Sequence, residues 1–574
     1  MVLGACRPAP CEVNGCRPSA EAACEVGLDT NGDGLCDRSV ADWSRTATLP
    51  EAGHRADIYQ LGPALDAVRA RGLEHFLSWP VSVSGALLPD RPMRRLLDPD
   101  TTDSNTQGLQ RAARYVLGFG TLPEMYDYLG LPERDAHHDA QPGVPWPAWV
   151  KPGDRLGVGT VETPEGPAMT FSCATCHAAN LFGRTVVGMT NRREQANEFF
   201  HKAAGFFPLL DADTFSRVMG ANRDEVKRFL ITQKHLGAVG ARTPQARGLD
   251  TSLAQVSLSL ARRTDDAMAT RDPAVEASPR PNLLETFVAD SKPAVWWTMK
   301  YKTRWLSDGS IVAGNPIFTN FLWNELGRGT DLDALQAWLK ENQQVVDELT
   351  AMVFATEAPR WVDFFGLDSI DEAAAMRGEQ TFLSLCASCH GTYEKGWSTP
   401  ATDKAQRLAT TRVRYHPQTP TFDVGTSPQR AQGMEAFAAS LNQLTVSQWM
   451  QTEVEVQTGY VPPPLEGIWA RYPYLHNQSV PTLCELLGPA AERTPVFYMG
   501  DDVEPATDFD AACVGLPVGD AVPAPWKDDA RRKYDTTLPG LSNVGHDAWL
   551  RDAEGQRVLG DVARAELIEY LKTL

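Results

Sequence analysis

The sequence predicts a mainly α-helical protein with long irregular loops and two similar domains in tandem. Apolar residues recur at helical spacing in the second half of the chain, whereas residues 141–167 are rich in proline and glycine. The motif Cys-x-x-Cys-His occurs twice, at residues 173–177 and 386–390. Because the motif occurs twice, the sequence indicates two modules. A chain of 574 residues is long enough for each module to have its own core.

The repeated motif predicts two covalently bound haems. Its two thiols are spaced to reach the two vinyl groups of one porphyrin, and the adjoining histidine binds the iron from the same side. We therefore expect two cytochrome c-like haem domains in tandem. The first set of haem residues is Cys173, Cys176 and His177, and the second set is Cys386, Cys389 and His390.

The chain divides into three expected segments. Residues 1–45 form a Cys-, Pro- and Gly-rich stalk that is too short and polar to make a core without cross-links. Residues 46–330 form the first haem domain, which carries the expected active site. Residues 331–574 form the second cytochrome c-like haem domain.

Helices are expected at both ends of the second domain. Apolar residues from Leu332 to Leu349 follow a helical pattern, and Ser369 with Glu372 forms a capping-box signature for a helix that leads to Cys386. Leu567, Tyr570, Leu571 and Leu574 mark a terminal helix. A helix before the haem motif and one at the end of the domain cross in class I cytochrome c folds. Only a few short strands are expected.

The stalk carries two candidate sites. Residues 3–6 (LGAC) match the lipobox of bacterial lipoproteins, which makes Cys6 a candidate lipid anchor, although no charged and apolar leader precedes it. Asp29, Asn31, Asp33 and Asp37 place oxygen ligands along a glycine-bent loop, as calcium sites do. A turn stapled by Cys24 and Cys36 explains the same residues, and the bidentate glutamate of a full EF-hand is missing.

Composition limits the location and the partners. The net charge of −19 and the lack of a Lys/Arg cluster argue against nucleic acid, and no apolar run reaches the roughly 20 residues of a membrane span. The acidic surface suits either a small basic redox protein or simple solubility. Cys484 and Cys513 form a disulfide or remain two free thiols, and a disulfide favours a periplasmic or extracellular location.

His546 is the candidate distal ligand of the second haem. It ends a glycine-containing loop just before the terminal helix, where a cytochrome c domain brings its sixth ligand. We expect His390 and His546 to hold the second iron together, which would leave the first haem as the reactive one.

Two segments after the second motif carry a family resemblance. Residues 461–469 (VPPPLEGIW) and 472–483 (YPYLHNQSVPTL) resemble the signature of dihaem cytochrome c peroxidase-like proteins. Within that superfamily the chain is most similar to the rubber oxygenases, which cleave the double bonds of polyisoprene with dioxygen, and to the dihaem fatty-acid dioxygenases.

The aromatic segment 295–305 (VWWTMKYKTRW) supports this resemblance. The resemblance implies that Trp297 lies between the haems and that Trp296 faces the distal pocket of the first haem. A second pocket aromatic of the rubber oxygenases is absent near Ile311 and Val312. Phe318 or Phe321 substitutes for it, or the substrate differs from rubber.

The leading hypothesis is an oxygenase that uses dioxygen at the first haem to oxidise or cleave C=C bonds of an apolar polyisoprenoid or unsaturated lipid. The second haem would be its electron-transfer partner. One alternative is a peroxidase that reduces hydrogen peroxide, with Glu198 or His201 as its acid–base residue. The other is a pure electron carrier with both irons six-coordinate.

Overall fold

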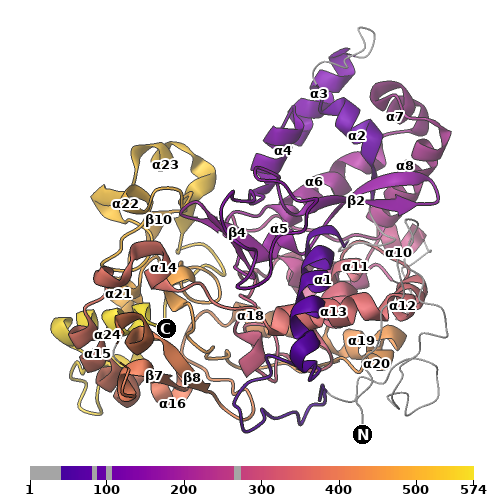
Figure 1. Ribbon diagram of the computed structural model, residues 1–574. Helices are drawn as coiled ribbons and strands as arrows, with labels where there is room; N and C mark the ends of the chain where they lie inside the picture. Colours follow the sequence, from indigo (N-terminus) through magenta and orange to yellow (C-terminus); the bar gives the residue numbers. More distant parts are fainter. Residues whose placement is uncertain (1–40, 80–86, 99–106, 264–272, 402) are drawn as a thin grey trace, which may run out of the picture.

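The computed structural model describes residues 41–79, 87–98, 107–263, 273–401 and 403–574 (Figure 1). Helices predominate there, and the strands are short, which confirms the mainly helical class. No helix in these ranges is long and apolar enough to cross a membrane. The predicted lipid anchor at Cys6 and the predicted calcium site at Asp29, Asn31, Asp33 and Asp37 lie outside the described residues.

Among the helices before the second motif, α1 packs against α13. α1 and α13 lie side by side in Figure 1, and Gly72 of α1 allows this contact, because a Cβ atom there would lie 2.3 Å from the Glu348 carbonyl oxygen. The helices of this part are α1 (Leu65–Ser78), α2 (Asp90–Leu96), α3 (Gln107–Leu117), α4 (Leu122–Leu129), α5 (Ala174–His177), α6 (Ala196–Phe206), α7 (Ala212–Met219), α8 (Arg223–Gly237), α9 (Ser252–Leu260), α10 (Pro273–Ala277), α11 (Pro316–Leu326), α12 (Leu332–Glu341) and α13 (Gln343–Phe354).

The strands form one three-stranded sheet and several antiparallel pairs. In the three-stranded sheet β3 (Gly166–Phe171) lies between β1 (Leu88–Pro89) and β2 (Val158–Thr163) and runs directly into the first haem motif. The pairs are β4 (Ala178–Leu181) with β5 (Arg184–Val187), β6 (Ile311–Ala313) with β9 (Glu453–Val454), β7 (Thr392–Lys395) with β8 (Thr410–Arg414), and β10 (Val496–Tyr498) with β11 (Lys533–Asp535).

The helix before the second motif and the terminal helix pack against each other as predicted. α15 (Glu372–Leu385) contacts α24 (Asp561–Lys572), where Phe382 and Tyr570 rings lie 5.2 Å apart. The predicted cap of α15 is wrong. Asp371 caps the helix by accepting from the Ala374 N–H, because the Ser369 hydroxyl is engaged with the Gly366 carbonyl and the Trp361 ring N–H.

Shorter helices complete the second part of the chain. They are α14 (Trp361–Phe365), α16 (Ala387–His390), α17 (Lys404–Leu408), α18 (Gln429–Gln432), α19 (Ala438–Gln443), α20 (Thr445–Trp449), α21 (Leu483–Leu486), α22 (Pro505–Asp508) and α23 (Ala524–Asp528). Cys484 of α21 forms a disulfide with Cys513, and the two Cα atoms lie 5.0 Å apart. Of the two alternatives predicted for Cys484 and Cys513, a disulfide or two free thiols, the structure contains the disulfide.

The close crossing of α15 and α24 depends on Gly378. A Cβ atom at this position would lie 2.0 Å from the Glu566 carbonyl oxygen. We expect Gly378→Ala to lower the free energy of unfolding by about 1–3 kcal/mol, because the helices must separate to admit the methyl group. Chemical denaturation of the haem-loaded protein measures this loss. Gly205→Ala is the matched control, since Gly205 of α6 has no neighbour within 4 Å, and an equal loss in both variants would contradict the packing argument.

The buried hydrophobic residues form two cores. The first core contains Cys173 together with Leu335, Leu339 and Leu349 of α12 and α13. The second core contains Phe382 and Tyr570, and also Leu181 of β4. Residues on both sides of position 331 thus enter both cores.

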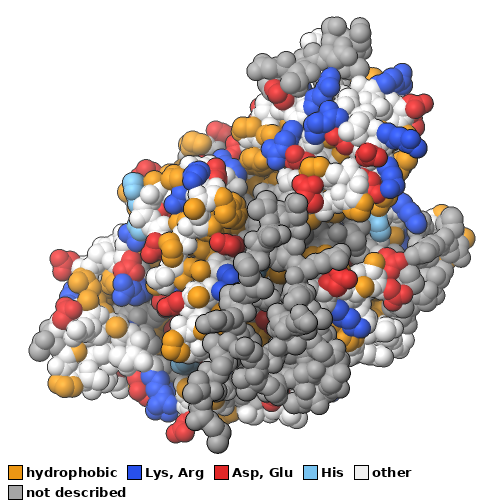
Figure 2. Space-filling view, turned by 45° about the vertical axis from the view of Figure 1, so that its right-hand side comes forward, with side chains coloured by type: hydrophobic (Ala, Val, Ile, Leu, Met, Phe, Trp, Pro, Cys, Tyr) orange, Lys and Arg blue, Asp and Glu red, His pale blue; other side chains and the backbone are white. Residues whose placement is uncertain are grey.

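Charged side chains of both signs are interspersed on the face shown in Figure 2. On the lobe formed by α2, α3 and α7, Lys and Arg are frequent but have acidic neighbours. Arg91 pairs with Glu225, and Arg94 pairs with Asp90 at 2.8 Å.

Candidate haem sites

The second haem motif presents a histidine whose orientation is set by the backbone. Cys386 precedes the first residue of α16, and Cys389 lies within this helix. Neither cysteine forms a disulfide. Nδ1 of His390 donates to the Pro463 carbonyl oxygen at 2.8 Å. A carbonyl can only accept, so Nδ1 carries the proton and Nε2 remains as the metal-binding nitrogen.

His546 faces His390 across a gap that suits one iron atom. The two ring centroids lie 6.2 Å apart. Nitrogen ligands about 2 Å from a metal on opposite sides hold two imidazole centroids about 6 Å apart. Burial lowers the pKa of His390 to about 4 and that of His546 to about 3, so both rings are neutral, as ligands must be.

Two further observations fit a bound haem at this place. Nδ1 of His546 is buried without a hydrogen-bond partner among the described residues, which a ligand can compensate. Lys302 is buried and Arg471 is half-buried, and neither forms an ion pair within the described ranges. Burial, and then the charge of Arg471, lowers the pKa of Lys302 to about 8. Haem carries two carboxylates, which buried cations of this kind would neutralise.

The first haem motif is built differently. α5 follows β3 with no preceding helix, so Cys173 comes directly from a sheet strand. Nδ1 of His177 donates to the Ala294 carbonyl oxygen at 3.1 Å, which again leaves Nε2 for the metal. The Trp296 ring stacks on the His177 ring, with centroids 4.6 Å apart and planes at 29°.

Trp296 and Trp297 reach towards different motifs. Trp296 contacts His177 of the first motif. Trp297 is fully buried, and its ring N–H donates to the Glu466 carbonyl oxygen at 2.8 Å. Glu466 belongs to the same loop as Pro463, which accepts from His390. Two adjacent tryptophans therefore connect the surroundings of both motifs.

The other residues predicted for the first site make their contacts elsewhere. Phe318 is buried in α11 and meets Trp449 edge to face at 5.8 Å, while Phe321 meets Trp79 at 4.6 Å. Glu198 pairs with Lys202, and Nδ1 of His201 donates to the Ala241 carbonyl oxygen. None of these contacts involves His177.

Sequence reasoning missed the carbonyl groups of Ala294 and Pro463, the buried Lys302 and the half-buried Arg471. Nothing in the local sequence marks a carbonyl as the partner of a distant histidine. Arg471 lies between the two segments that resemble the family signature, residues 461–469 and 472–483. That position in the sequence was the one clue that Arg471 belongs to the site.

One comparison with known proteins concerns the segment that contains Pro463 and Glu466. Residues 459–498 match a family model described as RoxA-like, cytochrome c-like. This segment is similar to the cytochrome part of rubber oxygenase-like proteins. Such a domain implies covalently bound haem c and a haem oxidoreductase.

Two curated relatives come from Sinorhizobium fredii strain NGR234. The chain is 26% identical over 543 residues to the uncharacterized protein y4iJ, covering 80% of this chain and 84% of that protein. It is 31% identical over 223 residues to the uncharacterized protein y4iM, covering 36% of this chain and 49% of that protein.

Proposed function

We propose that this protein is a dihaem oxygenase that uses dioxygen to oxidise or cleave C=C bonds of a polyisoprenoid or an unsaturated lipid. Haem c supplies the reaction with dioxygen at the first site and the transfer of electrons at the second. The observation that carries this proposal is the unequal surroundings of the two ligands: His390 has His546 opposite it, whereas His177 has Trp296 beside it.

The residues of the chain have distinct roles in this proposal. Cys173 and Cys176 would hold the first haem, and His177, oriented by the Ala294 carbonyl, would bind its iron. Cys386 and Cys389 would hold the second haem, and His390 and His546 would bind its iron. A second strong ligand excludes dioxygen, so the chemistry belongs to the first site.

Aromatic side chains would bind the apolar substrate and transfer electrons between the haems. Trp297 follows Trp296 in the sequence and donates to the loop that contains Pro463, so it would provide a short aromatic path between the two haems. Trp296 shields the His177 side of the first site from water. Phe318 is the proposed distal aromatic, with recognition by apolar contact rather than by salt bridges.

The disulfide between Cys484 and Cys513 supports a periplasmic or extracellular location, since disulfides persist in oxidising compartments. Anchoring through a lipid on Cys6 and calcium at Asp29, Asn31, Asp33 and Asp37 are further proposals for the stalk. A small redox protein would be the electron donor.

Incubation of the haem-loaded protein with polyisoprene latex and with oleic acid under dioxygen tests the proposal. We expect oxygenated products by mass analysis, each with atoms from ¹⁸O-labelled dioxygen, and none in an anaerobic control. Absence of product from both substrates would refute the oxygenase. Rapid turnover of hydrogen peroxide with a reduced donor would favour the peroxidase instead, and two low-spin haems that react with neither oxidant would favour the electron carrier.

A further inference from the structure

The loop that orients His390 also carries a carboxylate. Nδ1 of His390 donates to the Pro463 carbonyl oxygen at 2.8 Å. The Tyr393 hydroxyl donates to the His390 carbonyl oxygen at 2.9 Å and accepts from the Leu465 N–H at 2.6 Å. Glu466 is the next residue, so it belongs to a loop that is tied to the second motif at two points.

Glu466 also contacts the tryptophan pair. Its backbone carbonyl oxygen accepts from the Trp297 ring N–H at 2.8 Å, and Trp297 is fully buried. The adjacent Trp296 stacks on the His177 ring of the first motif. Glu466 therefore stands where the loop that orients His390 meets the aromatic path proposed between the haems.

The carboxylate of Glu466 is incompletely satisfied. Oε2 is buried without a hydrogen-bond partner among the described residues. Lys300 Nζ lies 3.9 Å from this oxygen and donates instead to the Thr356 carbonyl oxygen at 3.2 Å. The Tyr301 hydroxyl hydrogen-bonds to the same carboxylate and favours its charged form. A buried carboxylate oxygen without a donor favours the protonated form instead.

Charges of both signs surround this carboxylate. Lys300 belongs to η6 (Met299–Tyr301), Glu357 follows α13, and Lys395 ends β7. Arg471, on the C-terminal side of the same loop, donates to a backbone carbonyl. Burial, the largest effect, raises the pKa of Glu466 above its ordinary value, although Lys300 and Lys395 lower it. The carboxyl group is thus poised to change its charge when the charge near it changes.

We propose that the Glu466 carboxylate binds one proton when the second haem gains one electron. The electron comes from a small redox protein and reduces the iron from the ferric to the ferrous state. The proton comes from water and converts the carboxylate to a carboxyl group. An electron added in a buried region disfavours a neighbouring negative charge, which proton uptake removes. The inference rests on the electron-transfer role proposed for the second haem and not on the reaction with dioxygen.

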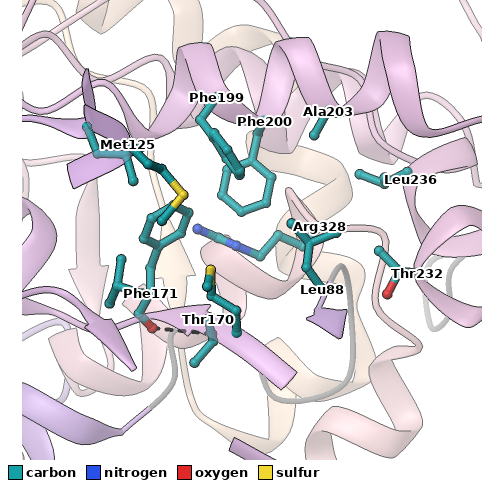
Figure 3. Close-up of a pocket in the computed structure, with 13 residues that line it drawn as sticks. Leu88, Met125, Thr170, Phe171, Phe199, Phe200, Ala203, Thr232, Leu236 and Arg328 are labelled. Carbon is teal, nitrogen blue, oxygen red and sulfur yellow. Dashed lines mark hydrogen bonds between the residues drawn. The ribbon is translucent and has the colours of Figure 1, made fainter. Parts of the chain in front are cut away.

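The first motif has different surroundings. Figure 3 shows the pocket beside it, where Arg328 lies between Phe171 and Phe200. The charges of Glu194 and Arg328 act on the Cys176 thiol. A pH dependence of the first haem would therefore have sources of its own, so the potential of the second haem must be followed separately, through its low-spin signal.

Redox titrations of the haem-loaded protein between about pH 5 and pH 9 test the proposal. In wild type we expect the potential of the second haem to fall by up to about 59 mV per pH unit over part of this range, a tenfold change in the reduction equilibrium for each tenfold change in proton activity. The potential falls as the pH rises because the ferrous state binds the additional proton. Proton uptake during reduction, measured with an indicator dye, should approach one proton per electron in the same range.

Substitutions of Glu466 separate its carboxyl group from other sources of pH dependence. Glu466→Gln should remove the slope and hold the potential near the low-pH value of wild type, because the amide is neutral at every pH. Glu466→Asp should keep the slope, since a carboxylate remains. The exposed Glu554→Gln is the matched control and should behave as wild type. The proposal is overturned if the wild-type potential of the second haem does not depend on pH, or if the slope persists in Glu466→Gln.

Lys300→Gln provides a second test that retains the carboxyl group. Lys300 stabilises the charged carboxylate, so its loss should raise the pKa of Glu466 and move the sloping range to higher pH. Should Glu466→Gln fail to fold, an unmoved range in Lys300→Gln overturns the proposal. A protein that shows the slope but yields no oxygenated product would refute the proposed oxygenase and leave the proton coupling standing.

Discussion

His546→Ala is expected to change one of the two haems from low-spin to high-spin. His390 and His546 face each other with centroids 6.2 Å apart, so removal of one ring leaves the iron of this site with a single protein ligand. Electronic absorption and electron paramagnetic resonance of the purified protein measure the change. The expected loss is one complete low-spin signal, with the covalent haem content unchanged.

His416→Ala is the matched control for this substitution. His416 lies next to the same motif, where its Nε2 donates to the Cys389 carbonyl oxygen at 2.9 Å, but no contact places it opposite His390. We expect its low-spin signal to persist. An unchanged spectrum of His546→Ala would remove His546 from the ligand set and reopen the question of which haem reacts.

The double substitution Cys173→Ser with Cys176→Ser is expected to abolish oxygenation while the second haem stays attached. Both thioether bonds to the first haem are lost, and the mass of the chain should fall by one haem. The low-spin signal that depends on His546 should remain. Intact-protein mass spectrometry and the product assay measure these two effects.

The reciprocal pair, Cys386→Ser with Cys389→Ser, is the control. It should also remove one haem, but it should remove the low-spin signal as well. If the variant without Cys173 and Cys176 still forms oxygenated product, the reaction does not occur at the first site.

Much of the second part of the chain could be predicted from its sequence. The helix before Cys386 and the terminal helix follow from apolar spacing, which depends only on one buried face for each helix. The cap of α15 was predicted at the wrong residue, because Ser369, Asp371 and the following residues offer competing side-chain acceptors. Only the position of Trp361 decides that Ser369 is engaged elsewhere.

The first part was predicted less well, since its organisation depends on contacts between distant segments. A strand rather than a helix leads into Cys173, and the carbonyl that orients His177 comes from Ala294, more than a hundred residues later. Residues on both sides of position 331 share cores for a similar reason. The apolar faces of α12 and α13 were predicted correctly. However, a helical pattern of apolar residues does not indicate which core the helix packs into, and both helices belong to the first core.

Both cores combine segments that lie far apart in the sequence. The first core takes α12 and α13 from beyond the first motif, and β9, from beyond the second motif, pairs with β6 before it. Neither core can close until residues on both sides of the second motif have been made. The finished protein should therefore unfold in one cooperative transition rather than in two separate steps.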